Sequence, residues 1–242
     1  MPAVVRERDR GPAIDPLAYP FDVPAAGFVW RAGEVASPGG PAGDLELSGR
    51  AAVLAIGSNA SPAQLSRKFA AERFRDPRVA DGVIPVVEAV APDVDVVYAA
   101  HVASYGSVPA TLVAAPGVRV HVFVCWLTPA QLARMNETEA LGRHYDLVAV
   151  PGVRSGGRAL ARAVAYMSTA GVARLGGQPL ALRTVAAEGR TLAADTQADV
   201  WDRLALERGD AGGGAALVAR AVADPAVRAS VIAHLRAGHL LD

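Results

Sequence analysis

The stretch AVLAIGSNASPAQL, residues 52–65, joins an apolar run to a helix start through one small polar turn. Ala51 to Ile56 are apolar, which is typical of a short buried strand. Ser61-Pro62-Ala63-Gln64 then supplies a helix N-cap, a proline at the first helical position and a capping-box glutamine. The pattern predicts a strand, a tight turn at Gly57-Ser58-Asn59 and a helix that extends to about Phe74.

The turn at residues 57–59 has three candidate roles: it binds an anion, presents a nucleophile or only reverses the chain. It is no phosphate loop, because neither Gly-x-x-x-x-Gly-Lys nor Gly-x-Gly-x-x-Gly surrounds it. Ser58 also lacks the Gly-x-Ser-x-Gly frame of a nucleophile elbow. Glycine and asparagine suit any tight turn. The chemical role that remains is a set of backbone N–H groups that converge on a carboxylate or an oxyanion.

Strand-like segments dominate the middle of the chain. Turn residues at Pro92-Asp93 and Pro116-Gly117 interrupt them, and a second helix is expected from Thr128 to about Ala140. Because few helices stand between the strands, we predict an α+β fold with a small mixed or antiparallel β-barrel. The segments expected as strands are residues 83–90, 94–102, 110–115, 120–127, 147–150 and 160–167.

The two ends of the chain differ in character from the middle, residues 49–171. Residues 1–48 are rich in proline and glycine and predict an arm, whose part before about Asp15 should be lost to mild proteolysis. The aromatic segment from Tyr19 to Trp30 is expected to lie against the body. Residues 172–242 are expected to form a C-terminal helical extension. Its helical patterns cover residues 196–207, 215–223 and 226–237.

Composition excludes several classes of partner and site. The 24 basic side chains balance 24 acidic ones, so no positive surplus indicates nucleic acid or an acidic membrane. The first residues lack the apolar core of a signal peptide, so we expect a cytoplasmic protein. Cys125 is the only cysteine and the five histidines lack ligand spacing, so neither a metal site nor another cofactor is expected. Lys68, the only lysine, is predicted on a helix, a context that suits neither a Schiff base nor a phosphate loop.

Carboxylates and tyrosines supply further candidates. Glu137 and Glu139 fall at the end of the second predicted helix, where the helix dipole disfavours acids. Such acids are ordinarily solvated, and the alternative is a carboxylate kept as a proton acceptor. Tyr145 and Tyr166 lie in or beside apolar strand patterns. Core packing is their ordinary role, and the alternative is that their hydroxyl groups line a pocket.

Taken in order, these motifs resemble the gamma-glutamylcyclotransferase family over about residues 51–171. Ile56-Gly57-Ser58-Asn59 is similar to the aromatic-Gly-Ser-Asn motif that ends the family's first strand. Residues 109–117, PATLVAAPG, are similar to its Ala-Thr-Leu/Ile-Val stretch and Pro-Gly turn. Asn136-Glu137-Thr138-Glu139 resembles its acidic Asp-x-x-Glu-Gly helix end. This chain departs from the family at Ile56, Asn136 and Ala140, where the family has an aromatic residue, Asp and Gly.

The resemblance implies an enzyme of the acyltransferase or cyclase type that releases 5-oxoproline from a γ-glutamyl amine or γ-glutamyl amino acid. The substrate's own α-amine attacks its γ-carbonyl, and no metal or other cofactor takes part. The alternative is a non-catalytic ligand-binding or scaffold domain of the same fold, and a homodimer is left open. Glu139 is the implied catalytic residue. The implied substrate-binding residues are Ile56, Gly57, Ser58, Asn59, Tyr145 and Tyr166.

Overall fold

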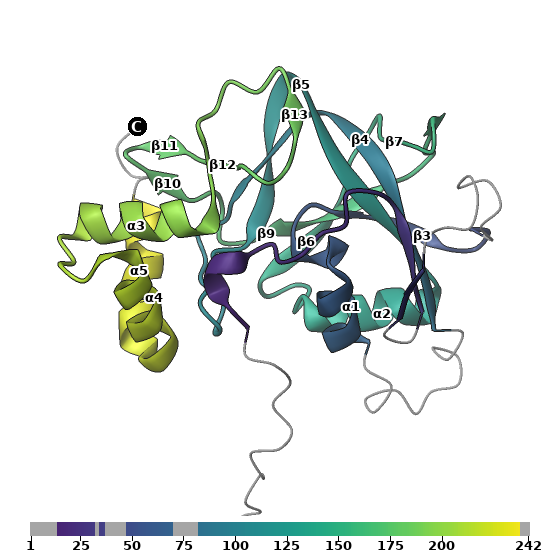
Figure 1. The fold of residues 1–242 in the computed structure, drawn as a ribbon. Helices are drawn as coiled ribbons and strands as arrows, with labels where there is room; N and C mark the ends of the chain where they lie inside the picture. Colours follow the sequence, from purple (N-terminus) through teal and green to yellow (C-terminus); the bar gives the residue numbers. More distant parts are fainter. Residues whose placement is uncertain (1–13, 32–33, 37–46, 70–81, 238–242) are drawn as a thin grey trace, which may run out of the picture.

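The computed structural model describes residues 14–31, 34–36, 47–69 and 82–237, and Figure 1 shows them as a mixed sheet with helices below it and to one side. This arrangement confirms the predicted α+β class. Cleavage before Asp15 and a helix end at Phe74 stay predictions, because residues 1–13 and 70–81 lie outside the described part of the chain.

The elements are named in chain order. The strands are β1 Phe28–Arg31, β2 Glu34–Ala36, β3 Ala51–Ala55, β4 Val83–Tyr98, β5 Ala110–Leu127, β6 Tyr145–Ala149, β7 Arg154–Ser155, β8 Arg158–Ala159, β9 Val164–Ser168, β10 Arg174–Leu175, β11 Gln178–Pro179, β12 Ala181–Leu182, β13 Ala187–Glu188 and β14 Ala194–Asp195. The helices are the 3-10 turns η2 Pro16–Ala18 and η4 Ser58–Ala60, and the α-helices α1 Pro62–Lys68, α2 Pro129–Thr138, α3 Gln197–Arg208, α4 Gly213–Ala223 and α5 Pro225–Ala237.

The main sheet is open and does not close into the small β-barrel that the sequence predicted. Its strand order is β14-β12-β4-β5-β3-β9-β6, and the two terminal strands do not pair within the described residues. Closure would need hydrogen bonds between β6 and β14. Strand β14 is only two residues long and is followed at once by helix α3, whose N-cap is Thr196. The chain therefore turns into a helix before a longer edge can form.

Strands β4 and β5 form one long antiparallel ribbon, whereas four shorter strands were predicted. The expected turns at Pro92-Asp93 and Pro116-Gly117 lie opposite each other as a bulge, where the register moves from Pro92↔Arg119 to Val94↔Ala114. Asp93 adopts a φ of 58°, and its Oδ1 accepts a 2.8 Å hydrogen bond from the Gly117 amide. The turn residues therefore bend two continuous strands instead of ending them.

The helix starts were predicted from two similar tetrapeptides, and only one of them forms its capping box. The Thr128 hydroxyl and the Gln131 side chain cap α2 reciprocally. Ser61 makes no side-chain cap bond to α1, because its backbone carbonyl already accepts from the Gln64 and Leu65 amides. The capping box predicted at Ser61 is therefore wrong, although the helix starts where expected.

The strands and helices predicted after residue 145 form, but residues 174–195 of the expected helical extension make the short strands β10 to β14 instead. Strands β6 and β9 pair antiparallel, with Leu147 opposite Tyr166, and the short β7–β8 hairpin lies between them. Helices α3, α4 and α5 begin and end within two residues of the predicted helical segments. Local patterning therefore predicted the type and place of these elements.

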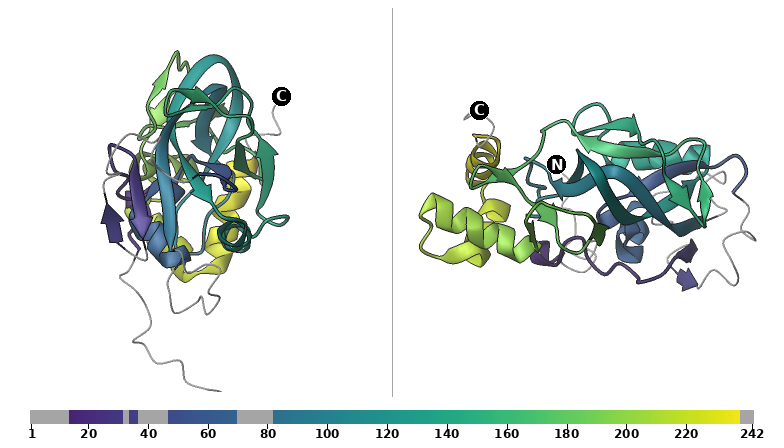
Figure 2. Two further views of the ribbon diagram at one scale, coloured as in Figure 1. Left: turned by 90° about the vertical axis from the view of Figure 1, so that its right-hand side faces the viewer. Right: turned by 90° about the horizontal axis from the view of Figure 1, so that it is seen from above.

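The segments at both ends of the described chain pack on the sheet. Tyr19, Phe28 and Trp30 are buried, and β1 pairs with β4, so the aromatic segment lies against the body as predicted. Helices α3 to α5 gather at one end of the molecule (Figure 2), and Trp201 and Leu235 share an apolar cluster with the sheet.

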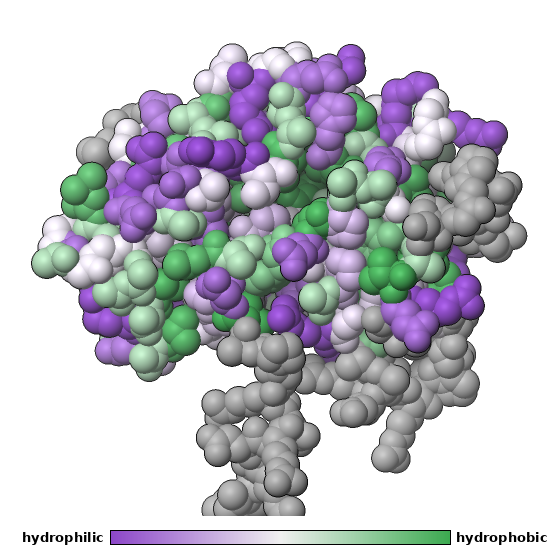
Figure 3. Space-filling model, viewed as in Figure 1, coloured by the Kyte–Doolittle hydropathy of each residue, from purple (hydrophilic) through white to green (hydrophobic). Residues whose placement is uncertain are grey.

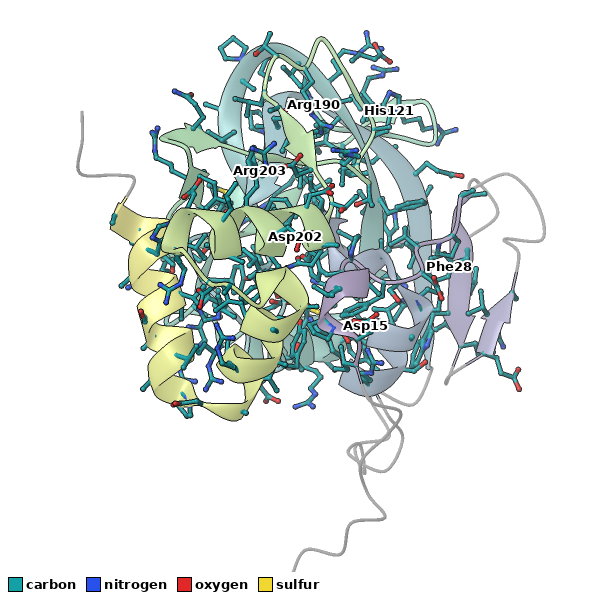
Figure 4. The ribbon with its side chains drawn as sticks, turned by 60° about the vertical axis from the view of Figure 1, so that its left-hand side comes forward. Asp15, Phe28, His121, Arg190, Asp202 and Arg203 are labelled. Atoms are coloured by element: carbon teal, nitrogen blue, oxygen red, sulfur yellow. The ribbon has the colours of Figure 1, made fainter. Side chains whose placement is uncertain are left out.

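Arg190, at the top of Figure 4, follows β13 and forms a 2.7 Å ion pair with buried Asp95 of β4.

Polar and apolar residues are interspersed over the face of the molecule in Figure 3. Within the described residues, no helix combines the length and the apolar character needed to cross a membrane.

Candidate active site

A cavity of about 530 Å³ contains every residue that the sequence indicated as a site residue. It lies where the end of β3, the end of α2, strands β6 and β9 and helix α5 meet. The structure thus brings together side chains that lie more than a hundred positions apart in the chain, from the turn after β3 to Tyr166. The predicted site residues in its lining are Ile56, Gly57, Ser58, Asn59, Glu139, Tyr145 and Tyr166.

The Gly57-Ser58-Asn59 turn contributes backbone groups to the cavity wall. Its carbonyls accept the local backbone hydrogen bonds, at 3.2 Å from the Ala60 amide to Gly57 and 2.9 Å from the Ser61 amide to Ser58. Within the described chain, the amides of Gly57 and Asn59 donate to no backbone oxygen. These two N–H groups are therefore available to a ligand, as an anion-binding turn requires.

Tyr19, from the segment before β1, packs directly on this turn. A Cβ atom added at Gly57 would lie 2.2 Å from the Tyr19 hydroxyl oxygen, so glycine is required by close approach. The Ala110 amide donates to that oxygen at 2.9 Å. Burial raises the pKa of Tyr19 above its ordinary value, so the hydroxyl stays protonated at neutral pH. The sequence indicated only that Tyr19 packs on the body, and its contact with Gly57 was not predicted.

Glu139 is the C-cap residue of α2 and its side chain is 13% exposed. Asn59 Nδ2 donates to its Oε1 at 2.9 Å, and Lys68 Nζ forms an ion pair with the same oxygen. Lys68 Nζ also donates to Asn59 Oδ1 at 2.6 Å, which closes a ring of three polar side chains. Within the described part of the chain Oε2 has no hydrogen-bond partner, so this oxygen is left for a ligand.

Lys68 was considered from the sequence only as a Schiff-base or phosphate lysine, and its pairing with Glu139 was missed. The signal in the sequence is that one lysine stands among many arginines, a few residues after the Gly-Ser-Asn turn. Glu137 behaves differently from Glu139: its side chain is 67% exposed and pairs with Arg134 at 3.0 Å. The structure therefore separates the two glutamates into one cavity residue and one surface residue.

Besides Tyr19, three more tyrosines line the cavity: Tyr105, Tyr145 and Tyr166. Tyr166 donates to Asn136 Oδ1 at 2.6 Å, and its ring meets that of Tyr145 edge to face, with 6.5 Å between centroids. Burial raises the pKa of both tyrosines. Burial, and next the Glu139 carboxylate, raises the pKa of Tyr105 to about 12. All three phenols are therefore neutral hydrogen-bond donors at neutral pH. Tyr105 was not among the residues that the sequence indicated.

The backbone just after Glu139 is strained. Ala140 has a φ of 51°, in the left-handed region, which costs about 1–2 kcal/mol for a residue with a Cβ atom. Glycine at this position recovers that cost and loses about 0.5–1 kcal/mol to backbone entropy. Ala140→Gly is therefore expected to raise the free energy of unfolding by about 0.5–1 kcal/mol, measured by thermal or urea unfolding.

Ala133, an exposed residue in the middle of α2, supplies the matched control. Ala133→Gly introduces the same glycine where φ is helical, so it is expected to lower stability by about 1 kcal/mol. If both substitutions lower stability, residue 140 carries no backbone strain.

A larger cavity of about 1100 Å³ also adjoins Ile56 and Gly57, and most of its charged side chains, Asp22 excepted, already have partners. The Glu88 carboxylate there accepts from the Gly27 amide at 2.7 Å, and Arg119 and His121 both pair with Glu188. Across the described residues, no cluster of three or more His, Cys, Asp or Glu side chains is arranged to hold a metal ion. The cavity around Glu139 is therefore the better candidate for chemistry.

Solved structures of other proteins match part of this chain. The fold is similar to that of a gamma-glutamyl cyclotransferase. That solved structure is 18% identical, with a TM-score of 0.37, and the match covers 50% of this chain and 67% of the other. YkqA from Bacillus subtilis is 18% identical with a TM-score of 0.38; the match covers 52% of this chain and 44% of YkqA, less than half its length.

A protein of Arabidopsis thaliana, solved in solution, is 16% identical with a TM-score of 0.37, over 66% of this chain and 86% of that one. No family model and no curated protein matches the chain. At these identities the likeness concerns the fold alone.

Proposed function

We propose that this protein is a γ-glutamylcyclotransferase-type enzyme that releases 5-oxoproline from a γ-glutamyl amine or γ-glutamyl amino acid. The observation that carries the proposal is the position of Glu139. Its carboxylate lines the cavity beside the Gly57-Ser58-Asn59 turn and is bonded to Asn59. A solvated glutamate at a helix end would instead have resembled Glu137, whose side chain is 67% exposed and pairs with Arg134.

The reaction needs one proton to move between two nitrogen atoms. The neutral α-amine of the substrate attacks the γ-carbonyl carbon, forming the new C–N bond. Its nitrogen then gives a proton to Glu139, and the same proton passes to the leaving nitrogen as the second C–N bond breaks. A single carboxylate performs both steps in turn, first as a general base and then as a general acid. Glu139 Oε2, with no partner in the described chain, is the atom suited to this transfer.

Negative charge develops on the carbonyl oxygen during the attack, and hydrogen-bond donors fixed around that oxygen lower the barrier. The free amides of Gly57 and Asn59 are donors of this kind. The neutral phenol of Tyr145 lines the same cavity and adds a further donor. Lys68 also lines the cavity, and its ammonium group binds Glu139 Oε1 and Asn59 Oδ1, which orients the carboxylate.

A panel of γ-glutamyl amines and γ-glutamyl amino acids tests the proposal. We expect at least one compound to yield 5-oxoproline and its free amine in equal amounts, measured by mass spectrometry. Saturable binding without release would instead support a non-catalytic ligand-binding domain. Neither binding nor release across the panel would contradict a γ-glutamyl ligand altogether.

A further inference from the structure

A further cavity of about 620 Å³, named the second cavity to distinguish it from the first one around Glu139, adjoins the candidate active site on the side of helix α5. Four residues line both cavities: His101, Arg143, His144 and Ile232. Glu139 and the turn at residues 57–59 line only the first cavity. The second cavity is therefore reached from the site of the reaction past these four residues.

The residues around this junction carry positive charge without acidic partners. Arg143 and Arg236 line the second cavity, and Arg228 lines the first; neither Asp nor Glu is among the residues that line the second. Across the described chain, none of these three arginines forms an ion pair, and the one acid of the first cavity, Glu139, is paired with Lys68. Each cavity is therefore lined by two of the three arginines, with Arg143 common to both, and cations gathered at such a junction favour the binding of an anion.

Backbone contacts hold two of these arginines in place. Arg228 Nη1 donates to the Ala221 carbonyl at 2.8 Å, and Arg236 Nε donates to the Ala100 carbonyl at 3.3 Å. Each guanidinium has five N–H donors, so most remain unused. The Arg143 side chain has no hydrogen-bond partner within the described residues, and it lies beside the histidine pair. The guanidinium groups are thus positioned in part before any ligand arrives.

The two histidines lie together between the cavities. The rings of His101 and His144 are 5.0 Å apart between centroids and tilted by 30°. Burial, and then the charges of His144, Arg236 and Arg228, lower the pKa of His101 to about 4. His101 is therefore neutral at pH 7, and a bound anion would offset the smaller, electrostatic part of the effect that lowers its pKa.

We propose that helix α5 and the loop after α2 form an anion-binding subsite, which takes a carboxylate or phosphate on the leaving group of the substrate. The inference rests on the proposed function. The γ-carbonyl and the α-amine of the substrate must lie at Glu139 and the turn, so the part that extends toward the second cavity is the leaving group. The C-terminal segment thereby selects the substrate, since both Arg228 and Arg236 belong to α5.

Two substrates that differ only in one carboxylate test the subsite: γ-glutamyl-alanine and γ-glutamyl-ethylamine. A hydrogen bond to a charged group corresponds to about a ten- to hundred-fold effect, so kcat/KM should be higher for γ-glutamyl-alanine by that factor. Arg228→Gln and Arg143→Gln should each remove most of the difference by raising KM for γ-glutamyl-alanine alone. Arg143→Gln also guards against misfolding, because its side chain bonds to no described residue.

Arg220→Gln is the matched control, since Arg220 lies on the surface of α4 and pairs with Asp210. It should leave both substrates unchanged. Equal losses for both substrates in Arg228→Gln would assign the arginine to the glutamyl carboxylate and overturn the leaving-group assignment. Equal kcat/KM for both substrates in the wild type would also overturn it.

A binding measurement separates this inference from the proposed function. Inorganic phosphate is titrated into the full chain, and the ring signals of His101 and His144 are followed by NMR. We expect a saturable shift that is lost in the Arg143→Gln, Arg228→Gln double variant. If no γ-glutamyl compound is turned over, this titration decides: a saturable shift supports an anion subsite in a protein of another function, and no shift overturns it. If γ-glutamyl compounds are turned over, the comparison of kcat/KM for γ-glutamyl-alanine and γ-glutamyl-ethylamine decides whether the subsite binds the leaving group.

Discussion

Glu139→Gln is expected to reduce 5-oxoproline release by about a hundred- to ten-thousand-fold, the range that general acid–base catalysis supplies. Glutamine keeps the shape of the side chain and an oxygen that can accept from Lys68 and Asn59. It cannot take the proton from the attacking amine. Because the Lys68 ammonium loses a charged partner, a fall in melting temperature of a few degrees is expected beside the loss of activity.

Glu137→Gln is the control, two positions away on the same helix. Its carboxylate is mostly exposed, and its pair with Arg134 is a surface ion pair of about 0–1 kcal/mol. Turnover should stay within about two-fold of the wild type, as expected for a surface change away from the site. The two variants are compared by kcat/KM and by thermal unfolding. Small and equal losses in an active protein would remove Glu139 from the mechanism.

Gly57→Ala is expected to disrupt the turn that lies against Tyr19. The backbone at residue 57 has a φ of −149°, outside the left-handed region in which glycine is required for its conformation. The obstacle is contact, because the new Cβ atom would lie 2.2 Å from the Tyr19 hydroxyl oxygen. Overpacking of this kind costs about 1–3 kcal/mol in stability. Turnover should fall by about ten-fold or more, since the amides in the cavity wall shift with the turn.

Tyr19→Phe tests the cause of that loss. Removing the hydroxyl leaves the Ala110 amide without its partner, so the single variant is itself destabilised by about 1–3 kcal/mol. In this background Gly57→Ala should cost less, with a coupling free energy of about 1 kcal/mol or more by urea unfolding. Tyr19→Phe removes only part of the steric clash, because Tyr19 Cζ lies only 3.2 Å from the added Cβ. If the losses of unfolding free energy in the two single variants are strictly additive in the double variant, contact with Tyr19 is not what requires glycine at position 57.

Local chemistry in the sequence determined the order of the elements around the site. An apolar run before Gly57, the Thr128 capping box and the helical periodicity after Thr196 each depend on residues close in the chain, and all three elements form. The same local signals placed Glu139 at the end of α2. The predictions of a barrel and of two chain-reversing turns in the β4–β5 ribbon were wrong, because strand pairing depends on contacts across the whole sheet and not on local sequence.

Only the tertiary structure decided which groups meet. Lys68 reaches Glu139 across 71 positions, Tyr19 reaches the Ala110 amide across 91, and Arg228 enters the cavity from the last helix. None of these contacts has a local pattern, since each is made by the packing of separate elements on the sheet. Long-range packing therefore brings these three side chains to one cavity, although each looked ordinary in the sequence. Local propensity does not encode such packing.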